Sequence, residues 1–183
     1  MRINNLPNLR YAVSLKSHST YRVGGEAEYF YEAHDRPSLE RAVLAACADN
    51  LPYYVLGGGT NVLAPDSGFG GLLIKIMMSQ VDVSDEMINA EAGVPMGALV
   101  NKAKALGLSG LEWAAGLPGT LGGAIYGNAG SYGGEMADFV VSVETFNPID
   151  KTIKQYPKYQ CDFKYRHSIF KEKKEVILGA VLK

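Results

Sequence analysis

Glycines gathered in two short segments are the residues of this chain best suited to binding an anion. The first segment, Gly57-Gly58-Gly59-Thr60-Asn61, directly follows the apolar run Tyr53-Tyr54-Val55-Leu56. Backbone N–H groups in such a turn can form a concave anion site, to which threonine and asparagine side chains add hydrogen bonds. The pattern is neither a dinucleotide fingerprint nor a P-loop, because Pro65 and Asp66-Ser67-Gly68 follow where a helix is required. A tight structural turn is the alternative interpretation.

The second segment runs from residue 116 to 124, and related residues follow it up to position 130. Its candidate binding residues are Pro118, Gly119, Gly122, Gly123, Asn128 and Gly130. Proline suits the first turn of a helix, whose N-terminal amides would be free to face a negative group. The alternative is glycine-mediated packing of a short helix against a sheet. Two such segments in one small chain favour a phosphate-bearing cofactor held between two lobes.

A third segment, residues 161–171, carries an arginine between an aromatic residue and a histidine. The guanidinium of Arg166 could bind a carboxylate through two hydrogen bonds, and a surface salt bridge is the alternative. Ser168 is interpreted as a turn or cap hydroxyl. The histidines have no acidic partner at a recognisable spacing, so the sequence does not predict a Ser-His-Asp site.

Alternating strand and helix patterns must position these segments. Aromatic and β-branched residues predict a strand over 20–33 with a bend at Gly24-Gly25. Apolar residues at helical spacing predict helices over 37–47 and 96–106. Further strands are expected over 53–56, 72–76, 88–92, 139–146, 153–156 and 176–182. This is an α+β organisation with a seam near residues 77–80.

The composition excludes several classes of protein. Of the 183 residues 47% are hydrophobic and the formal net charge is −1, which is typical of a globular chain with a real core. A charge near zero argues against nucleic acid or an anionic membrane as partner. No segment has the length of a signal peptide or a membrane span, so a cytoplasmic protein is expected. Cys47 and Cys161 are interpreted as small buried hydrophobes, and histidine spacing predicts no metal site.

These three segments, together with the stretch Leu15 to Ala27 (LKSHSTYRVGGEA), resemble the UDP-N-acetylenolpyruvoylglucosamine reductase (MurB) family. The resemblance runs from about Leu15 to Lys183. It implies a two-lobed α+β FAD-binding fold of the vanillyl-alcohol-oxidase/PCMH type, with lobes at residues 1–78 and 79–183. It also implies noncovalent FAD and NADPH as the reductant.

The resemblance assigns roles by position. The loop of residues 57–61 matches the family turn that binds the FAD pyrophosphate, and the six residues of the second segment match a stretch along the flavin and its phosphates. Arg166 matches the arginine that polarises the substrate carboxylate and stabilises the enolate formed after hydride addition. Charge stabilisation of this kind is often the largest catalytic effect.

The family reaction converts UDP-N-acetylglucosamine enolpyruvate to UDP-N-acetylmuramate for peptidoglycan. Family members continue into a third domain that supplies a serine proton donor and a glutamate, and nothing like it follows Lys183. Ser168 and Glu135 are not assigned to that role. The chain is therefore expected to be the FAD-binding part of a reductase. The alternative is a stand-alone flavin-binding module that has lost the reaction or needs a partner chain.

Overall fold

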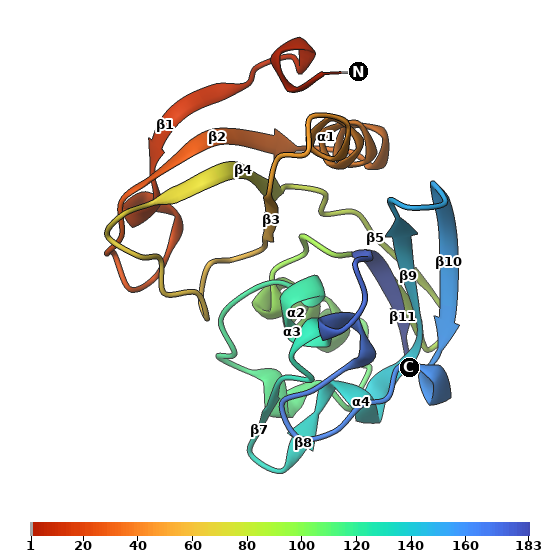
Figure 1. Ribbon diagram of the computed structural model, residues 1–183. Helices are drawn as coiled ribbons and strands as arrows, with labels where there is room; N and C mark the ends of the chain where they lie inside the picture. Colours follow the sequence, from red (N-terminus) through yellow and green to blue (C-terminus); the bar gives the residue numbers. More distant parts are fainter. Residues whose placement is uncertain (1) are drawn as a thin grey trace. The chain divides into compact units, whose positions relative to one another are not determined.

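The computed structural model describes residues 2–183 and divides into two compact units, Met1–Met78 and Ser79–Lys183. Each unit has its own sheet (Figure 1). Among the described residues, no helix is long and apolar enough to cross a membrane.

The first unit is a four-stranded sheet in the order β1-β2-β4-β3, with one α-helix packed on β2 and β4. Strands β2, β4 and β3 are parallel, and β1 is antiparallel to β2. The carboxyl ends of the three parallel strands therefore lie at one edge of the sheet. The bounds are β1 (Arg10–Ser14), β2 (Glu26–Ala33), α1 (Arg36–Ala48), β3 (Tyr53–Leu56) and β4 (Phe69–Ile76), with short 3-10 turns η1 (Ile3–Asn5) and η2 (Leu15–His18).

Helix α1 begins at a capping box. The Asp35 carboxylate accepts a hydrogen bond from the Ser38 amide (2.7 Å), and the Ser38 hydroxyl accepts one from the Asp35 amide (3.1 Å). Together they satisfy two backbone donors at the helix start. The predicted apolar face of α1 is confirmed for Leu39 and its neighbours, but the prediction for Cys47 is wrong because its side chain is exposed. It lies near the end of the helix, where the buried stripe stops.

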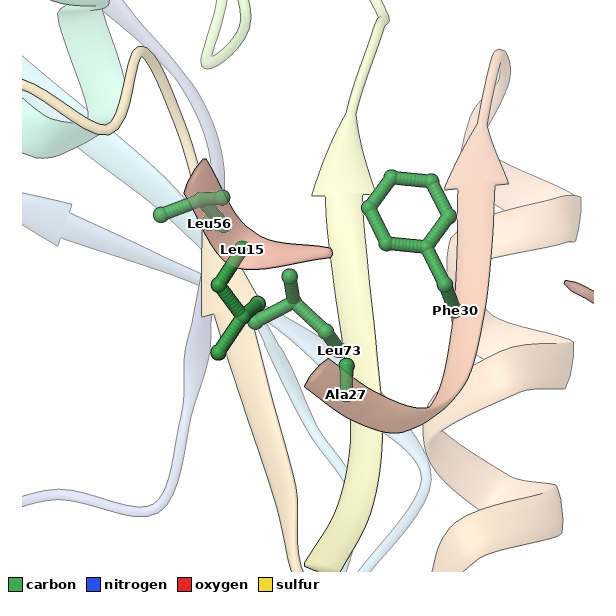
Figure 2. Packing of buried hydrophobic residues seen from close by; sticks show 5 residues of the cluster. All are labelled: Leu15, Ala27, Phe30, Leu56 and Leu73. Carbon is green, nitrogen blue, oxygen red and sulfur yellow. The ribbon is translucent and has the colours of Figure 1, made fainter. Parts of the chain in front are cut away.

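A second group of apolar side chains packs around β2, β3 and β4. Figure 2 shows its five buried members. They are Leu15, Ala27, Phe30, Leu56 and Leu73. Side chains alternate along a strand, so Lys75 shares the face of Leu73, while Ile74 points to the opposite face. The apolar cluster therefore ends, at the carboxyl edge of β4, in a lysine.

The second unit is a five-stranded antiparallel sheet in the order β10-β9-β11-β6-β5, and α3 packs on β6 and β11. Its strands are β5 (Val81–Ser84), β6 (Met87–Glu91), β9 (Val140–Asn147), β10 (Thr152–Pro157) and β11 (Val176–Leu182), and β7 (Gly130–Ser131) pairs with β8 (Gly134–Glu135). Its helices are α2 (Met96–Ala105), α3 (Leu121–Tyr126) and α4 (Met136–Phe139), with 3-10 turns η3 (Glu112–Ala114), η4 (Lys158–Gln160) and η5 (Ile169–Lys171).

The predicted strand over 20–33 is wrong in its first part. Only Glu26–Ala33 is strand, because Gly24 adopts φ +111° and the Gly25 amide bonds the Pro65 carbonyl (2.9 Å) instead of a neighbouring strand. The sequence patterns also did not reveal β1, β5 and the short α4, in which Phe139 lies. The helices α1 and α2 and the strands β3 and β11 lie where they were predicted.

Replacing Phe30 by alanine tests the core of the first unit. Phe30 is fully buried, so Phe30→Ala removes a ring that no other side chain can replace, and we expect the free energy of unfolding to fall by about 3–5 kcal/mol. Urea denaturation measures this. Leu63→Ala, at a side chain 71% exposed, is the control and should change stability by less than about 0.5 kcal/mol. Equal losses in the two variants would contradict this packing.

The two cysteines should differ in reactivity. Burial raises the pKa of the Cys161 thiol to about 11, whereas Cys47 is exposed. Because the thiolate is the reactive form, iodoacetamide at about pH 8 should modify Cys47 and spare Cys161 in the folded chain. Peptide mass spectrometry locates the label, and denaturant should make both cysteines react. Labelling of Cys161 at the rate of Cys47 in native protein would contradict this expectation.

Candidate functional site

The glycine loop of residues 57–61 lies at the carboxyl end of β3 and packs against residues 18–20. Gly59 is buried with φ +66°, and a Cβ there would overlap the His18 carbonyl oxygen. The Thr20 amide donates to the Gly59 carbonyl (3.1 Å), and the Ser19 hydroxyl donates to the Val62 carbonyl (2.9 Å). These contacts hold the backbone of the loop in a fixed turn, and its Gly58 remains exposed.

An open pocket of about 590 Å³ lies beside this loop. It is lined by Lys16, Ser17, His18, Ser19, Thr20, Arg22, Gly58 and Lys75. Three of these residues are cationic, and none has a carboxylate. Ligands of open sheets with parallel strands bind outside the carboxyl ends of the strands, which is where this pocket lies. Its charge and position suit a small anion.

Lys75 and His18 meet in this pocket. The Lys75 ammonium lies 3.5 Å from Nδ1 of His18, whose ring packs against Phe30 with 4.4 Å between centroids. The pKa of His18 is lowered, first by burial and then by the positive charges of Lys75 and Arg10. Glu32 acts in the opposite direction but more weakly. Burial and the neighbouring cations thus both disfavour the charged form of this imidazole.

The second glycine segment differs from its prediction. Helix α3 begins at Leu121, so Pro118 lies in the loop before the helix and not in its first turn. The amides of Leu121 and Gly122 donate to the carbonyls of Val94 (2.9 Å) and Ala92 (2.8 Å), so they are not free to bind an anion. A Cβ at Gly122 would lie 2.8 Å from that of Ala92. This part of the segment follows the alternative interpretation, close packing against the sheet.

Other residues of the second segment stay open to a ligand. Gly119 adopts φ +110°, and Gly123 is exposed, where a Cβ would have only the Thr120 hydroxyl (3.7 Å) near it. The Thr120 hydroxyl is buried and has no hydrogen-bond partner among the described residues. A buried hydroxyl without a partner costs free energy, so a polar ligand atom would satisfy it.

Asn128 connects the second segment to the third. The residue is 1% exposed. Its Nδ2 donates to the Lys164 carbonyl (3.1 Å), and its Oδ1 accepts from the Ala137 amide (2.9 Å). The Ser168 hydroxyl makes a parallel connection by donating to the Tyr126 carbonyl (2.8 Å). The structure therefore brings the two segments together, with Asn128 as a structural bridge and Ser168 fully engaged. Gly130 lies in the β7–β8 hairpin, where a Cβ would come within 3.0 Å of the Gly134 carbonyl oxygen.

Arg166 lies in a tight turn held by reciprocal hydrogen bonds between the backbones of Lys164 and His167 (3.1 and 2.9 Å). It adopts φ +54°, which is uncommon for a residue with a side chain, and its carbonyl accepts from Lys171 Nζ (2.7 Å). The guanidinium is exposed and lies 5.8 Å from the ring of Tyr165. No ion pair involves it among the described residues, so the structure does not support a surface salt bridge.

Three residues of the pocket, Lys75, His18 and Arg22, were given no role from the sequence. Lys75 had a recognisable signal, because it interrupts the buried run Leu72-Leu73-Ile74 before Ile76. A lysine in such a strand needs a polar neighbour or a ligand. His18 gave no such signal, since its proximity to Lys75 depends on how residues 15–25 fold back over the sheet.

Comparison with known proteins places the chain among flavoproteins. A family model described as FAD binding domain matches residues 27–154. The UDP-N-acetylenolpyruvoylglucosamine reductase of Synechococcus sp. (strain RCC307) is 37% identical over 176 residues, which are 94% of this chain and 58% of the relative. That of Solibacter usitatus (strain Ellin6076) is 36% identical over 180 residues, 97% of this chain and 57% of the relative. The chain thus spans less than two thirds of these relatives.

Solved structures give the same result for the fold. The crystal structure of the reductase MurB from Thermus caldophilus superposes with a TM-score of 0.82 and 34% identity, covering 96% of this chain and 62% of that one. Alkyldihydroxyacetonephosphate synthase matches with a TM-score of 0.65 and 20% identity, covering 88% of this chain and 32% of that one, and shows the fold alone. The expected α+β fold of the vanillyl-alcohol-oxidase/PCMH type is confirmed.

Two glycines with left-handed backbones allow a matched test of the loop. A Cβ at Gly59 (φ +66°) meets the His18 carbonyl, whereas nothing lies within 4 Å of a Cβ at Gly107 (φ +69°). We expect Gly107→Ala to lower the free energy of unfolding by about 1–2 kcal/mol, the cost of the backbone conformation. Gly59→Ala should lower it by clearly more, as measured by thermal or urea unfolding. Equal losses would mean that the close packing at Gly59 is unimportant.

Proposed function

Since the chain belongs to the FAD binding domain family, we propose that it binds FAD noncovalently as the flavin-binding part of a UDP-N-acetylenolpyruvoylglucosamine reductase. The observation that carries the proposal is the pocket beside Gly58, where glycine backbone and three cationic side chains meet without a carboxylate. A diphosphate group needs such surroundings, because both backbone N–H groups and cations stabilise its negative charge.

The loop Gly57-Gly58-Gly59-Thr60-Asn61 is the proposed diphosphate site. The packing at Gly59 fixes the backbone of the loop, and the exposure of Gly58 leaves room for a ligand to approach. Because the loop is held in place by residues 18–20, little ordering is needed when the anion binds. The residues present therefore fit the cofactor that the family implies.

The second segment is the proposed flavin site, with Pro118, Gly119, Gly122, Gly123, Asn128 and Gly130 as its residues. Two of these residues shape the site and do not donate to the cofactor. The Gly122 amide and the Asn128 side chain already make hydrogen bonds within the chain. The structure adds Thr120 to this proposed flavin site. Its buried hydroxyl has no hydrogen-bond partner among the described residues, and a polar atom of the cofactor would supply one.

The proposed reaction is reduction of UDP-N-acetylglucosamine enolpyruvate to UDP-N-acetylmuramate in cytoplasmic peptidoglycan synthesis. FAD, when bound, supplies the hydride transfer chemistry, with NADPH as the source of hydride. Arg166 is the proposed catalytic residue: its unpaired guanidinium binds the substrate carboxylate and stabilises the negative charge that develops beside it. Ser168 takes no part as a proton donor, because its hydroxyl donates a hydrogen bond to the Tyr126 carbonyl.

FAD should stabilise the purified chain. A ligand that binds only the folded state at about 100 times its Kd adds about 2.7 kcal/mol, which raises the Tm of a chain of this size by several degrees. We expect Gly58→Val to abolish most of this shift, because a branched side chain would occupy the wall of the pocket. Arg166→Ala should retain the shift, because this arginine faces the substrate in the proposal.

Gly97→Val is the matched control for the pocket variant, since Gly97 lies on α2 with nothing within 4 Å of a Cβ. It should bind FAD like the unchanged chain. A chain that shows neither flavin absorbance nor a thermal shift with excess FAD would overturn the proposed function. Equal loss of FAD from the Gly58 and Arg166 variants would overturn the division of roles between them.

A further inference from the structure

The Lys75 ammonium is a partly buried cation without a partner of opposite charge among the residues that the structure describes. No described carboxylate lies within ion-pair distance of it, although Glu32 is its neighbour across β2 and β4. The Glu32 carboxylate instead bonds the Arg10 guanidinium (2.9 Å) and lies 3.9 Å from His34. Because no described carboxylate neutralises this ammonium and it lines an open pocket, it can pair with an anion supplied from outside.

His18 is the titratable group that an anion in this pocket would face. Near its ring lie Lys75 of β4, Arg10 of β1, and Phe30 and Glu32 of β2. Lys16 and Arg22 line the same pocket. Of these charged groups only Glu32 favours a protonated imidazole, and its carboxylate is already paired with Arg10. The surroundings thus favour the neutral imidazole of His18 while no anion is present.

We propose that Lys75 is the side-chain ligand of the diphosphate group in this pocket, and that His18 takes up a proton when the anion binds. The inference rests on the proposed function, and it assigns two residues to which neither the family resemblance nor the glycine loop gave a role. Lys75 supplies a fixed charge, and His18 supplies a charge that appears only in the complex.

The direction of the coupling follows from electrostatics. A dianionic group beside His18 offsets the charges of Lys75 and Arg10 and favours the imidazolium. Because linkage is reciprocal, an anion that favours the protonated imidazole must itself bind more tightly when His18 is protonated. FAD affinity should therefore rise as the pH falls from about 8 to about 6, through the range in which histidine titrates.

The first test measures FAD affinity of the full chain by flavin fluorescence, with Lys75→Met against Lys102→Met. Both variants lose one lysine charge and keep a long apolar side chain, but Lys102 is exposed on α2 and does not line the pocket. We expect Lys75→Met to weaken binding at least about tenfold, the scale of a lost hydrogen bond to a charged group. Lys102→Met should bind normally, and Lys75→Arg should restore most of the affinity.

The second test measures proton uptake. Calorimetry of FAD binding at about pH 6.5 in two phosphate-free buffers of different ionisation enthalpy reports the protons exchanged. The diphosphate of FAD is a diester without an ionisation in this range, so an uptake belongs to the protein. We expect a fraction of one proton for the unchanged chain and none for His18→Gln. His18→Phe, which keeps a ring against Phe30, should also show none if the proton is taken up at this position.

The outcomes separate the inference from its premise. Normal FAD affinity in Lys75→Met, or the same proton uptake with and without His18, overturns the inference and leaves FAD binding intact. A chain that binds no FAD at any pH overturns the proposed function, and the inference falls with it. Thermal unfolding without FAD shows whether each variant is folded. If Lys75→Met does not fold, the FAD affinity of Lys75→Arg is compared with that of the unchanged chain, and a large loss of affinity in this variant, which keeps the charge, overturns the inference.

Discussion

The close contact between Gly59 and the His18 carbonyl is the constraint on which the first unit's site depends. No residue with a side chain fits at position 59, because a Cβ would occupy the place of that oxygen. The contact fixes two backbones at once: the turn after β3 and the segment that continues from η2. Only then do His18 and Arg22, far from Lys75 in the sequence, line one pocket with it. A steric requirement at one glycine thus assembles an electrostatic site.

In the second unit a buried side chain, that of Asn128, fixes the positions of two backbone segments. Asn128 uses both ends of its amide to connect the Lys164 carbonyl with the start of α4. A buried amide that satisfies two backbone groups specifies their positions strongly, because losing either bond leaves a polar group unpaired. The residue was selected from the sequence as a cofactor contact, and the structure gives it a clear structural role: it holds the turn that presents Arg166.

Local patterns predicted the parts of the fold that local chemistry determines. The spacing of apolar residues located α1 and α2, and short runs of aromatic and aliphatic residues located β3 and β11. Patterns failed where tertiary contacts decide. Residues 20–25 form no strand because the Thr20 and Gly25 amides bond to the carbonyls of Gly59 and Pro65 in a distant loop. Pro118 starts no helix because Gly119, which follows it, adopts φ +110°. The glycine segments were visible in the sequence, but the position of His18 beside Lys75 depends on long-range contacts of the fold.

The turn of Arg166 separates a fixed backbone from a free side chain. Reciprocal hydrogen bonds close the turn, Lys171 bonds the Arg166 carbonyl, and the guanidinium remains exposed. A ligand that binds this arginine must therefore restrict the rotamers of one side chain, which costs about 2 kcal/mol of conformational entropy, but not those of a loop. Ordering a mobile loop of four residues would cost roughly 1–2 kcal/mol for each backbone unit. Most of the entropic cost of recognition at this position is thus incurred when the chain folds.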